Sequence, residues 1–119
     1  MDVKKGQIVW VKLDGSGSEQ QGNPRPCIVV QNNVGNKFSD TTIIVPLTRR
    51  IPKRLLPTHV TIEGKHLGRY FEDSTILTEQ IKVIDVQRII RVQQKLPKTF
   101  IDLIDEKMLI SLGIESSAS

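Results

Sequence analysis

Residues 22–48 read GNPRPCIVVQNNVGNKFSDTTIIVPLT, in which two short apolar runs rich in β-branched residues stand among turn-forming residues. The runs at 26–32 and 41–48 have the length and composition of strands that lie in a protein core. The cluster NNVGNKFSD between them is typical of a turn. Pro46, inside the second run, predicts a bulge or an edge position there. This stretch therefore predicts two antiparallel strands joined by a polar connection.

The rest of the first hundred residues continues this pattern. Further strands are predicted at 7–13, 59–63, 74–84 and 88–96, and the glycine- and serine-rich segment 14–24 is a loop. Strand follows strand with no long helix between them, which indicates a small antiparallel barrel or a strongly bent sheet. We interpret the chain as mainly β, a small barrel.

From residue 97 onward the hydrophobic period changes from that of a strand to that of a helix. Pro97 suits a first helical turn and Gly113 suits the stop. Apolar residues recur at helical spacing, at Phe100, Ile101, Ile104, Met108 and Leu112. The sequence therefore predicts one domain over residues 1–113, a barrel closed by a C-terminal helix, and a frayed tail at 114–119.

The composition excludes several kinds of metal site and an intramolecular disulfide. The chain has 119 residues, of which 38% are hydrophobic and 25% charged, with a net charge of +4. A single cysteine allows no intramolecular disulfide and no thiolate zinc site, and two histidines allow no multi-histidine metal site within one chain. Cys27 is expected to be a small buried hydrophobe. No signal peptide or membrane span is recognisable, so a cytoplasmic protein without a metal is expected.

The basic charge is concentrated. Between Asp40 and Glu63 the sequence has no acidic residue, but it has four cations in the loop that leaves the run 41–48. These are Arg49, Arg50, Lys53 and Arg54. If the strands 26–32 and 41–48 pair antiparallel, Arg25 at the start of one faces Thr48 at the end of the other. Such a rim suits a polyanion, although a charge run is often only a solvated surface.

The order of motifs resembles the MazF/PemK family of toxin endoribonucleases, especially the EndoA-type proteins of Gram-positive bacteria. The stretches that carry the resemblance are GQIVWVKL, GNPRPCIVVQNNVGN, TTIIVPLT, LPTHVTIE and STILTEQIKVID. It covers residues 3 to about 112. Pro46 departs from it, since a smaller residue is common there. The resemblance implies a homodimeric SH3-like barrel that acts in the cytoplasm as the toxin of a toxin–antitoxin pair. It also implies sequence-specific, ribosome-independent cleavage of single-stranded RNA without a metal or another cofactor.

The resemblance places the catalytic arginine on Arg25 and the catalytic threonine on Thr48. It places the loop that shapes the RNA and antitoxin groove on residues 14–24, and the antitoxin is expected to bind through an acidic, partly disordered segment. We expect RNA contacts from Glu19, Gln20, Gln21, Pro26, Arg49, Arg50, Lys53, Arg54, His59 and Gln80. Trp10 is expected in the core rather than stacked on a base.

The residue chemistry fits RNA cleavage. RNA carries its own nucleophile, the 2′-hydroxyl, and attack on the adjacent phosphate adds negative charge to the phosphate oxygens. A guanidinium held between two prolines gives a fixed, permanently charged bidentate donor for those oxygens. Because a guanidinium is a poor general base, Arg25 is assigned mainly to charge stabilisation.

Two other functions remain open at this point. One is a non-catalytic toxin on the same fold that binds a protein target, as the CcdB-like gyrase poisons do. The other is an RNA-binding barrel without catalysis, which the low aromatic content of 4% makes less attractive. The Arg25–Thr48 pair beside a cationic loop favours the endoribonuclease.

Overall fold

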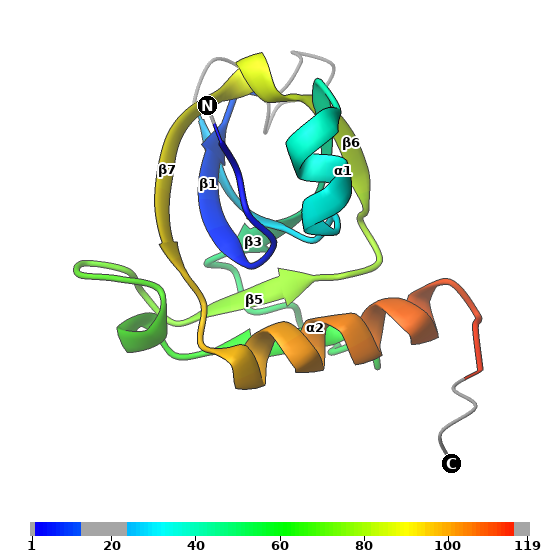
Figure 1. The fold of residues 1–119 in the computed structure, drawn as a ribbon. Coiled ribbons are helices and arrows are strands. Elements are labelled where there is room, and N and C mark those ends of the chain that lie inside the picture. Colours follow the sequence, from blue (N-terminus) through cyan, green and yellow to red (C-terminus); the bar gives the residue numbers. More distant parts are fainter. Residues whose placement is uncertain (1, 13–23, 116–119) are drawn as a thin grey trace.

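A computed structural model describes residues 2–12 and 24–115, and Figure 1 shows the fold as a ribbon. The described elements, in chain order, are β1 (Gln7–Val11), β2 (Arg25–Val29), α1 (Asn33–Phe38), β3 (Thr41–Thr48), β4 (His59–Ile62), η2 (Gly64–His66), β5 (Ser74–Leu77), β6 (Lys82–Asp85), η3 (Val86–Arg88), β7 (Ile89–Lys95) and α2 (Lys98–Ser111).

The strands form one strongly bent antiparallel sheet in the order β4-β5-β3-β2-β1-β7, and β6 pairs with β3 off this path. β3 is the central strand, because its first half pairs with β6 from Thr41 to Ile44 and its end pairs with β5 at Leu47 and Thr48. The mainly β fold with a C-terminal helix is confirmed. The closed barrel is wrong, since β4 and β7 end the sheet and do not pair with each other in the described part of the chain.

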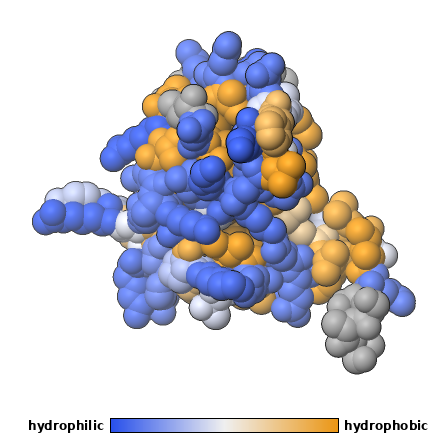
Figure 2. Space-filling model, viewed as in Figure 1, coloured by the Kyte–Doolittle hydropathy of each residue, from blue (hydrophilic) through white to orange (hydrophobic). Residues whose placement is uncertain are grey.

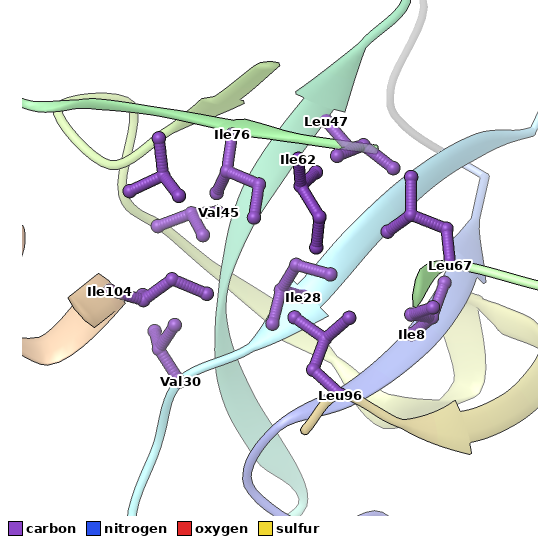
Figure 3. Close-up of a cluster of buried hydrophobic side chains, with 11 residues drawn as sticks. Ile8, Ile28, Val30, Val45, Leu47, Ile62, Leu67, Ile76, Leu96 and Ile104 are labelled. Carbon is purple, nitrogen blue, oxygen red and sulfur yellow. The ribbon is translucent and has the colours of Figure 1, made fainter. Parts of the chain in front are cut away.

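Alternate residues of the central strands face two separate hydrophobic clusters, which is the pattern expected of strands that are buried on both faces. One cluster, shown in Figure 3, includes Ile8, Ile28 and Val45 and extends to Ile104 of α2. The other lies on the opposite face and includes Val9, Cys27 and Ile44. Two buried faces hold the sheet in place, so the ends of its strands are fixed positions for a site.

Helix α2 runs below β5 in Figure 1 and covers the first cluster with its apolar side. Pro97 is the residue just before the helix, and Gly113 follows it with a φ of +70°, the left-handed conformation that ends many helices. The predicted helix and its stop are confirmed. Leu112 is a correction, because it is 57% exposed rather than packed.

Three other predictions about the chain need correction. The turn cluster after β2 contains α1, a short helix without buried residues, which begins where the Asn32 side chain accepts a hydrogen bond from Gly35 N. The predicted strand 74–84 is two strands, because Thr78 leaves the sheet and its hydroxyl donates to the Thr58 carbonyl. Pro46 is not at an edge, but it lies where β3 changes partner from β6 to β5.

Figure 2 shows where the surface is apolar in the same view. Hydrophilic residues cover most of the left side, and hydrophobic residues gather on the right around the end of α2, where Ile110, Leu112 and Ile114 are about half exposed. Within residues 2–12 and 24–115, no helix is long and apolar enough to cross a membrane. Most of the tail predicted to fray, residues 116–119, lies outside the described residues.

Candidate active site: a cationic groove

Arg25 and Thr48 lie at the same end of two paired strands. Arg25 is the first residue of β2 and Thr48 the last of β3, and the register pairs Cys27 with Pro46. Two residues further along this antiparallel register, Arg25 stands opposite Thr48. Both residues line one groove of about 910 Å³. The predicted convergence of Arg25 and Thr48 on one rim is confirmed.

The groove lies between the ends of β2 and β3, one face of β1 and β7, and the segment that precedes β5. Its lining residues are Trp10, Pro24, Arg25, Pro26, Leu47, Thr48, Arg49, Arg50, Arg69, Tyr70, Phe71, Glu72, Ser74, Arg91 and Gln93. Five of these are arginines and one is a glutamate, Glu72, which faces the Arg49 guanidinium at 3.9 Å. The groove is therefore far more cationic than the net charge of the chain suggests, and it suits a phosphate-rich ligand.

The Thr48 hydroxyl has a defined orientation. Its Oγ1 accepts a hydrogen bond of 3.1 Å from the backbone N–H of Arg50. This bond uses a lone pair of Oγ1, so the hydroxyl hydrogen can point toward an oxygen in the groove. Thr48 can thus act as a neutral donor beside the guanidinium of Arg25.

Cys27 lies directly behind the site but does not take part in it. Its side chain is fully buried, and burial raises the pKa of the thiol to about 12, although Arg25 and Lys82 act in the opposite direction. A thiol with such a pKa is neutral at physiological pH. The prediction that Cys27 is a small buried hydrophobe is confirmed.

Three aromatic residues line the groove. Trp10 and Phe71 pack with ring centroids 5.8 Å apart, and the Trp10 indole N–H donates to Gln93 Oε1 at 2.9 Å. Tyr70 stands at the rim and is 90% exposed. Trp10 is half-buried rather than part of either core cluster, so its predicted core position is wrong.

Apart from His59, the residues predicted to contact RNA divide into three groups. Pro26, Arg49 and Arg50 line the groove with Arg25 and Thr48. Lys53, Arg54 and Gln80 are exposed on neighbouring loops but do not line the groove. The predicted contacts Glu19, Gln20 and Gln21 lie outside the described residues.

His59 is held inside the protein. Its side chain is 5% exposed, its Nδ1 accepts a hydrogen bond from Leu56 N at 3.1 Å, and its Nε2 lies 3.2 Å from Glu79 Oε2. Because Nδ1 accepts, Nε2 carries the proton and donates it to Glu79. His59 does not line the groove. These contacts tie the His59 ring to Leu56 of the basic loop and to Glu79.

Glu79 is the partly exposed acidic partner of the buried His59 ring. Burial opposes its ionisation, but hydrogen bonds from its own backbone, His59 and Thr58 outweigh burial and lower the pKa of Glu79 below its usual value. The carboxylate is thus charged at neutral pH, and it fixes the position of His59.

Sequence reasoning missed the groove contribution of Arg69, Tyr70, Arg91 and Gln93. Arg91 and Gln93 belong to β7, where their alternate spacing places them on one face, and that spacing was a usable signal. Arg69 and Tyr70 lie in an irregular segment whose position no local pattern predicts. Within the described part of the chain, no three His, Cys, Asp or Glu side chains gather as metal ligands.

Comparison with known proteins shows which family the chain belongs to. Residues 4–112 match the model of the PemK-like, MazF-like toxins of type II toxin–antitoxin systems, and the chain belongs to this family. It is 41% identical over 114 residues to endoribonuclease EndoA of Bacillus subtilis (strain 168), a match that covers 96% of this chain and 97% of that protein.

Solved structures with the same fold are more distant in sequence. An endoribonuclease from mycobacterial species superposes with a TM-score of 0.78 at 16% identity, over 98% of this chain and 96% of that chain. The MazF protein (form I) of Deinococcus radiodurans gives a TM-score of 0.74 at 23% identity, over 96% and 99%. A MazE–MazF structure (form II) from the same organism gives 0.73 at 22% identity, over 97% and 99%. At these identities the likeness concerns the fold.

Proposed function

We propose that this chain is the toxin of a type II toxin–antitoxin system and a sequence-specific, metal-independent endoribonuclease that cuts single-stranded RNA. The observation that supports this most directly is the register that brings Arg25 opposite Thr48 in a groove with four further arginines. The family match over residues 4–112 and the 41% identity to an endoribonuclease agree with it. We also take residues 1–113 as one domain.

In the proposed reaction the 2′-hydroxyl of the RNA attacks the adjacent phosphorus. A bond forms between the 2′-oxygen and phosphorus, and the bond from phosphorus to the 5′-oxygen breaks. The 2′-hydroxyl loses its proton and the departing 5′-oxygen gains one. The products are a 2′,3′-cyclic phosphate and a 5′-hydroxyl end.

Arg25 and Thr48 act on the phosphate. The Arg25 guanidinium donates two hydrogen bonds to nonbridging oxygens as their negative charge grows, and Thr48 donates a third through its hydroxyl. Pro24 and Pro26 restrict the backbone on both sides of Arg25, so less entropy is lost when it engages the phosphate. The task of Arg25 is charge stabilisation, because a guanidinium keeps its protons at physiological pH.

The remaining groove residues bind the strand. Arg49 and Arg50 continue the positive surface beside Thr48, and the exposed Lys53 and Arg54 extend it along the basic loop. Phosphate contacts of this kind supply affinity that falls steeply with salt, with a slope of roughly −0.7 per phosphate neutralised on a single strand. Residues 14–24 are proposed to read base edges.

The proposed protein partners are an antitoxin and a second copy of the chain. An acidic antitoxin segment would suit the five arginines of the groove, and it would exclude RNA by occupying the same place. We further infer a homodimer, which the resemblance implies and for which the exposed apolar residues around the end of α2 offer contact area. An mRNA substrate would place the protein in the cytoplasm.

Cleavage of a long single-stranded RNA in EDTA tests the function. The wild type should cut at a few discrete sites, and Arg25→Ala should lose at least 10²-fold in rate while remaining folded, which is the typical cost of removing a preorganised donor (about 10²–10³-fold). Arg25→Lys should also be impaired, because an ammonium keeps the charge and loses the bidentate geometry. Lys37→Ala removes an exposed cation from α1 and serves as the matched control.

The outcomes separate the rival functions. Arg25→Ala protein that cuts within threefold of wild type would remove Arg25 from the mechanism. Intact RNA in every lane, with tight salt-dependent binding, would indicate an RNA-binding protein without catalysis. Intact RNA without binding would indicate a toxin that acts on a protein. In a separate assay the cognate antitoxin and an uncleavable RNA should compete, and a stable ternary complex would contradict the shared groove.

A further inference from the structure

We propose that Tyr70 is a base-stacking residue at the rim of the groove, and that it holds one base of the bound single strand. The proposal rests on the proposed function, since it assigns the base-binding part of the same site. It concerns a single side chain that the Arg25–Thr48 chemistry does not use.

Tyr70 has an unusual backbone and an unusual exposure. Its φ is +73°, and it is the only non-glycine residue with a positive φ in the described part of the chain. The left-handed region is unfavourable for an aromatic residue, so its surroundings must hold it there. The side chain gains no burial in return, because 90% of the residue is exposed. A strained conformation that presents an aromatic ring to solvent points to a ligand.

The segment that carries Tyr70 is anchored on both sides. Before it, the Leu67 carbonyl accepts a hydrogen bond from Gln94 Nε2, and Gly68 turns the chain with a φ of +136°. After it, Asp73 Oδ1 accepts a hydrogen bond from Gly64 N at 2.8 Å, and Phe71 packs against Trp10. Figure 1 shows this segment, in green, projecting at the left of the molecule before β5. Its ends are fixed, so the ring is presented at a defined place on the rim.

The surroundings of Tyr70 are those of a single-strand binding site. Three of the five aromatic residues of the chain, Trp10, Tyr70 and Phe71, line this groove. The Arg69 guanidinium lies over the Tyr70 ring, 5.3 Å from its centroid. An arginine beside an aromatic platform lets one nucleotide place its phosphate on the cation and its base on the ring. The arginines alone would bind any polyanion, whereas the ring adds a contact that only a base can satisfy.

Binding of an uncleavable RNA tests the inference. The RNA is the segment cut by the wild type, with a 2′-O-methyl group at the scissile nucleotide. Loss of one base–aromatic stack corresponds to roughly a 5–150-fold weaker Kd, so Tyr70→Ala should weaken binding within that range. Tyr70→Phe keeps the ring and should bind within twofold of wild type.

The chain supplies a matched control for this variant. Phe38 is 77% exposed on α1, and Lys37 Nζ lies 5.3 Å from its ring centroid, so it is also an exposed aromatic beneath a cation. It does not line the groove. Phe38→Ala should leave RNA binding unchanged. Thermal unfolding should show that Tyr70→Ala is folded, since no buried contact is removed.

A second readout detects the ring itself. Tyr70 is the only tyrosine of the chain, so 3-fluorotyrosine labelling gives one ¹⁹F resonance. Uncleavable RNA should shift this resonance further than tripolyphosphate, which occupies the cations, including Arg69, without a base. Equal shifts by the two ligands would contradict stacking. A wild type that cuts RNA while Tyr70→Ala binds and cuts identically would overturn the stacking role alone. A wild type that binds RNA without cutting would refute the proposed function, and the ¹⁹F shift would still decide whether Tyr70 stacks.

Discussion

Replacing Gly64 by alanine tests how closely the segment before β5 approaches η2. A Cβ atom at position 64 would stand 2.0 Å from the carbonyl oxygen of Phe71 and 2.8 Å from its carbonyl carbon, and the φ of Gly64 is not positive. Since such Cβ contacts do not fall below 3.0 Å, the backbone at Phe71 must move by at least about 1 Å, the difference between 3.0 and 2.0 Å. The obstacle is main chain, which no side-chain rotation can relieve.

The expected cost follows from this displacement. Overpacking of a well-packed site costs about 1–3 kcal/mol, and here we expect the upper half of that range, because the shift also strains the hydrogen bond from Gly64 N to Asp73. For a chain of this length, about 2–3 kcal/mol lowers Tm by roughly 8–12 °C. Phe71 and Glu72 line the groove, so their movement should also reduce RNA cleavage, by up to about 10²-fold.

Urea unfolding and the RNA cleavage assay measure the two effects. Trp10 is the only tryptophan and it contacts Phe71, so its fluorescence reports both unfolding and the local displacement. Gly35→Ala is the control, because the three atoms nearest to its Cβ would be side-chain atoms of Gln31, at 3.0–3.2 Å, and alanine favours a helix over glycine by about 1 kcal/mol. We expect Gly35→Ala to unfold within about 1 kcal/mol of wild type. Wild-type stability and wild-type cleavage in Gly64→Ala would refute the close approach of the two segments.

Three further predictions concern ionisable groups. Because the pKa of Cys27 is raised to about 12, a thiol reagent at pH 8 should label the protein in urea and not in its native state; rapid native labelling would contradict the burial. The pKa of Glu79 is lowered in the folded protein, so its stabilising contribution is complete above the unfolded value near 4.5 and is lost as pH falls through the folded value. Glu79→Gln should therefore lower the free energy of unfolding at pH 7 and flatten its decline in acid, as urea titrations between pH 3 and 7 would show. Glu72→Gln removes the carboxylate that faces Arg49, so it should tighten binding of an uncleavable RNA and steepen the salt dependence; weaker binding would show that Glu72 contacts the RNA favourably.

Much of the sheet can be predicted from local pattern. The strand at 41–48 matches β3 at both ends, because a run of β-branched residues with turn residues before it leaves few alternatives. Helix α1 was missed because its stability comes from polar contacts that periodicity does not reveal. Its Asn36 side chain accepts hydrogen bonds from Thr42 Oγ1 and Gln31 Nε2, and no residue of the helix is buried.

Only the part of the site that depends on the pairing of neighbouring strands could be predicted from the sequence. Arg25 and Thr48 were placed together because antiparallel neighbours bring the start of one strand beside the end of the next. His59 was expected to face RNA, and its buried bond to Glu79 depends on a residue twenty positions away that sequence alone does not place beside it. Tyr70 was missed for the same reason, since its position depends on contacts with β7 and η2.

Cleavage and base stacking, the two proposed tasks of the groove, depend on different parts of the fold. Arg25 and Thr48 owe their positions to strand register, whereas Tyr70 stands on a stretch held by other contacts. These are the bond between Gly64 and Asp73, the bond between Leu67 and Gln94, and the packing of Phe71 on Trp10. Substitutions confined to residues 68–70 would leave Phe71, Glu72 and the two cutting residues unchanged. The way in which the groove holds a base can therefore be altered at residues 68–70 without a change in the strands that carry Arg25 and Thr48.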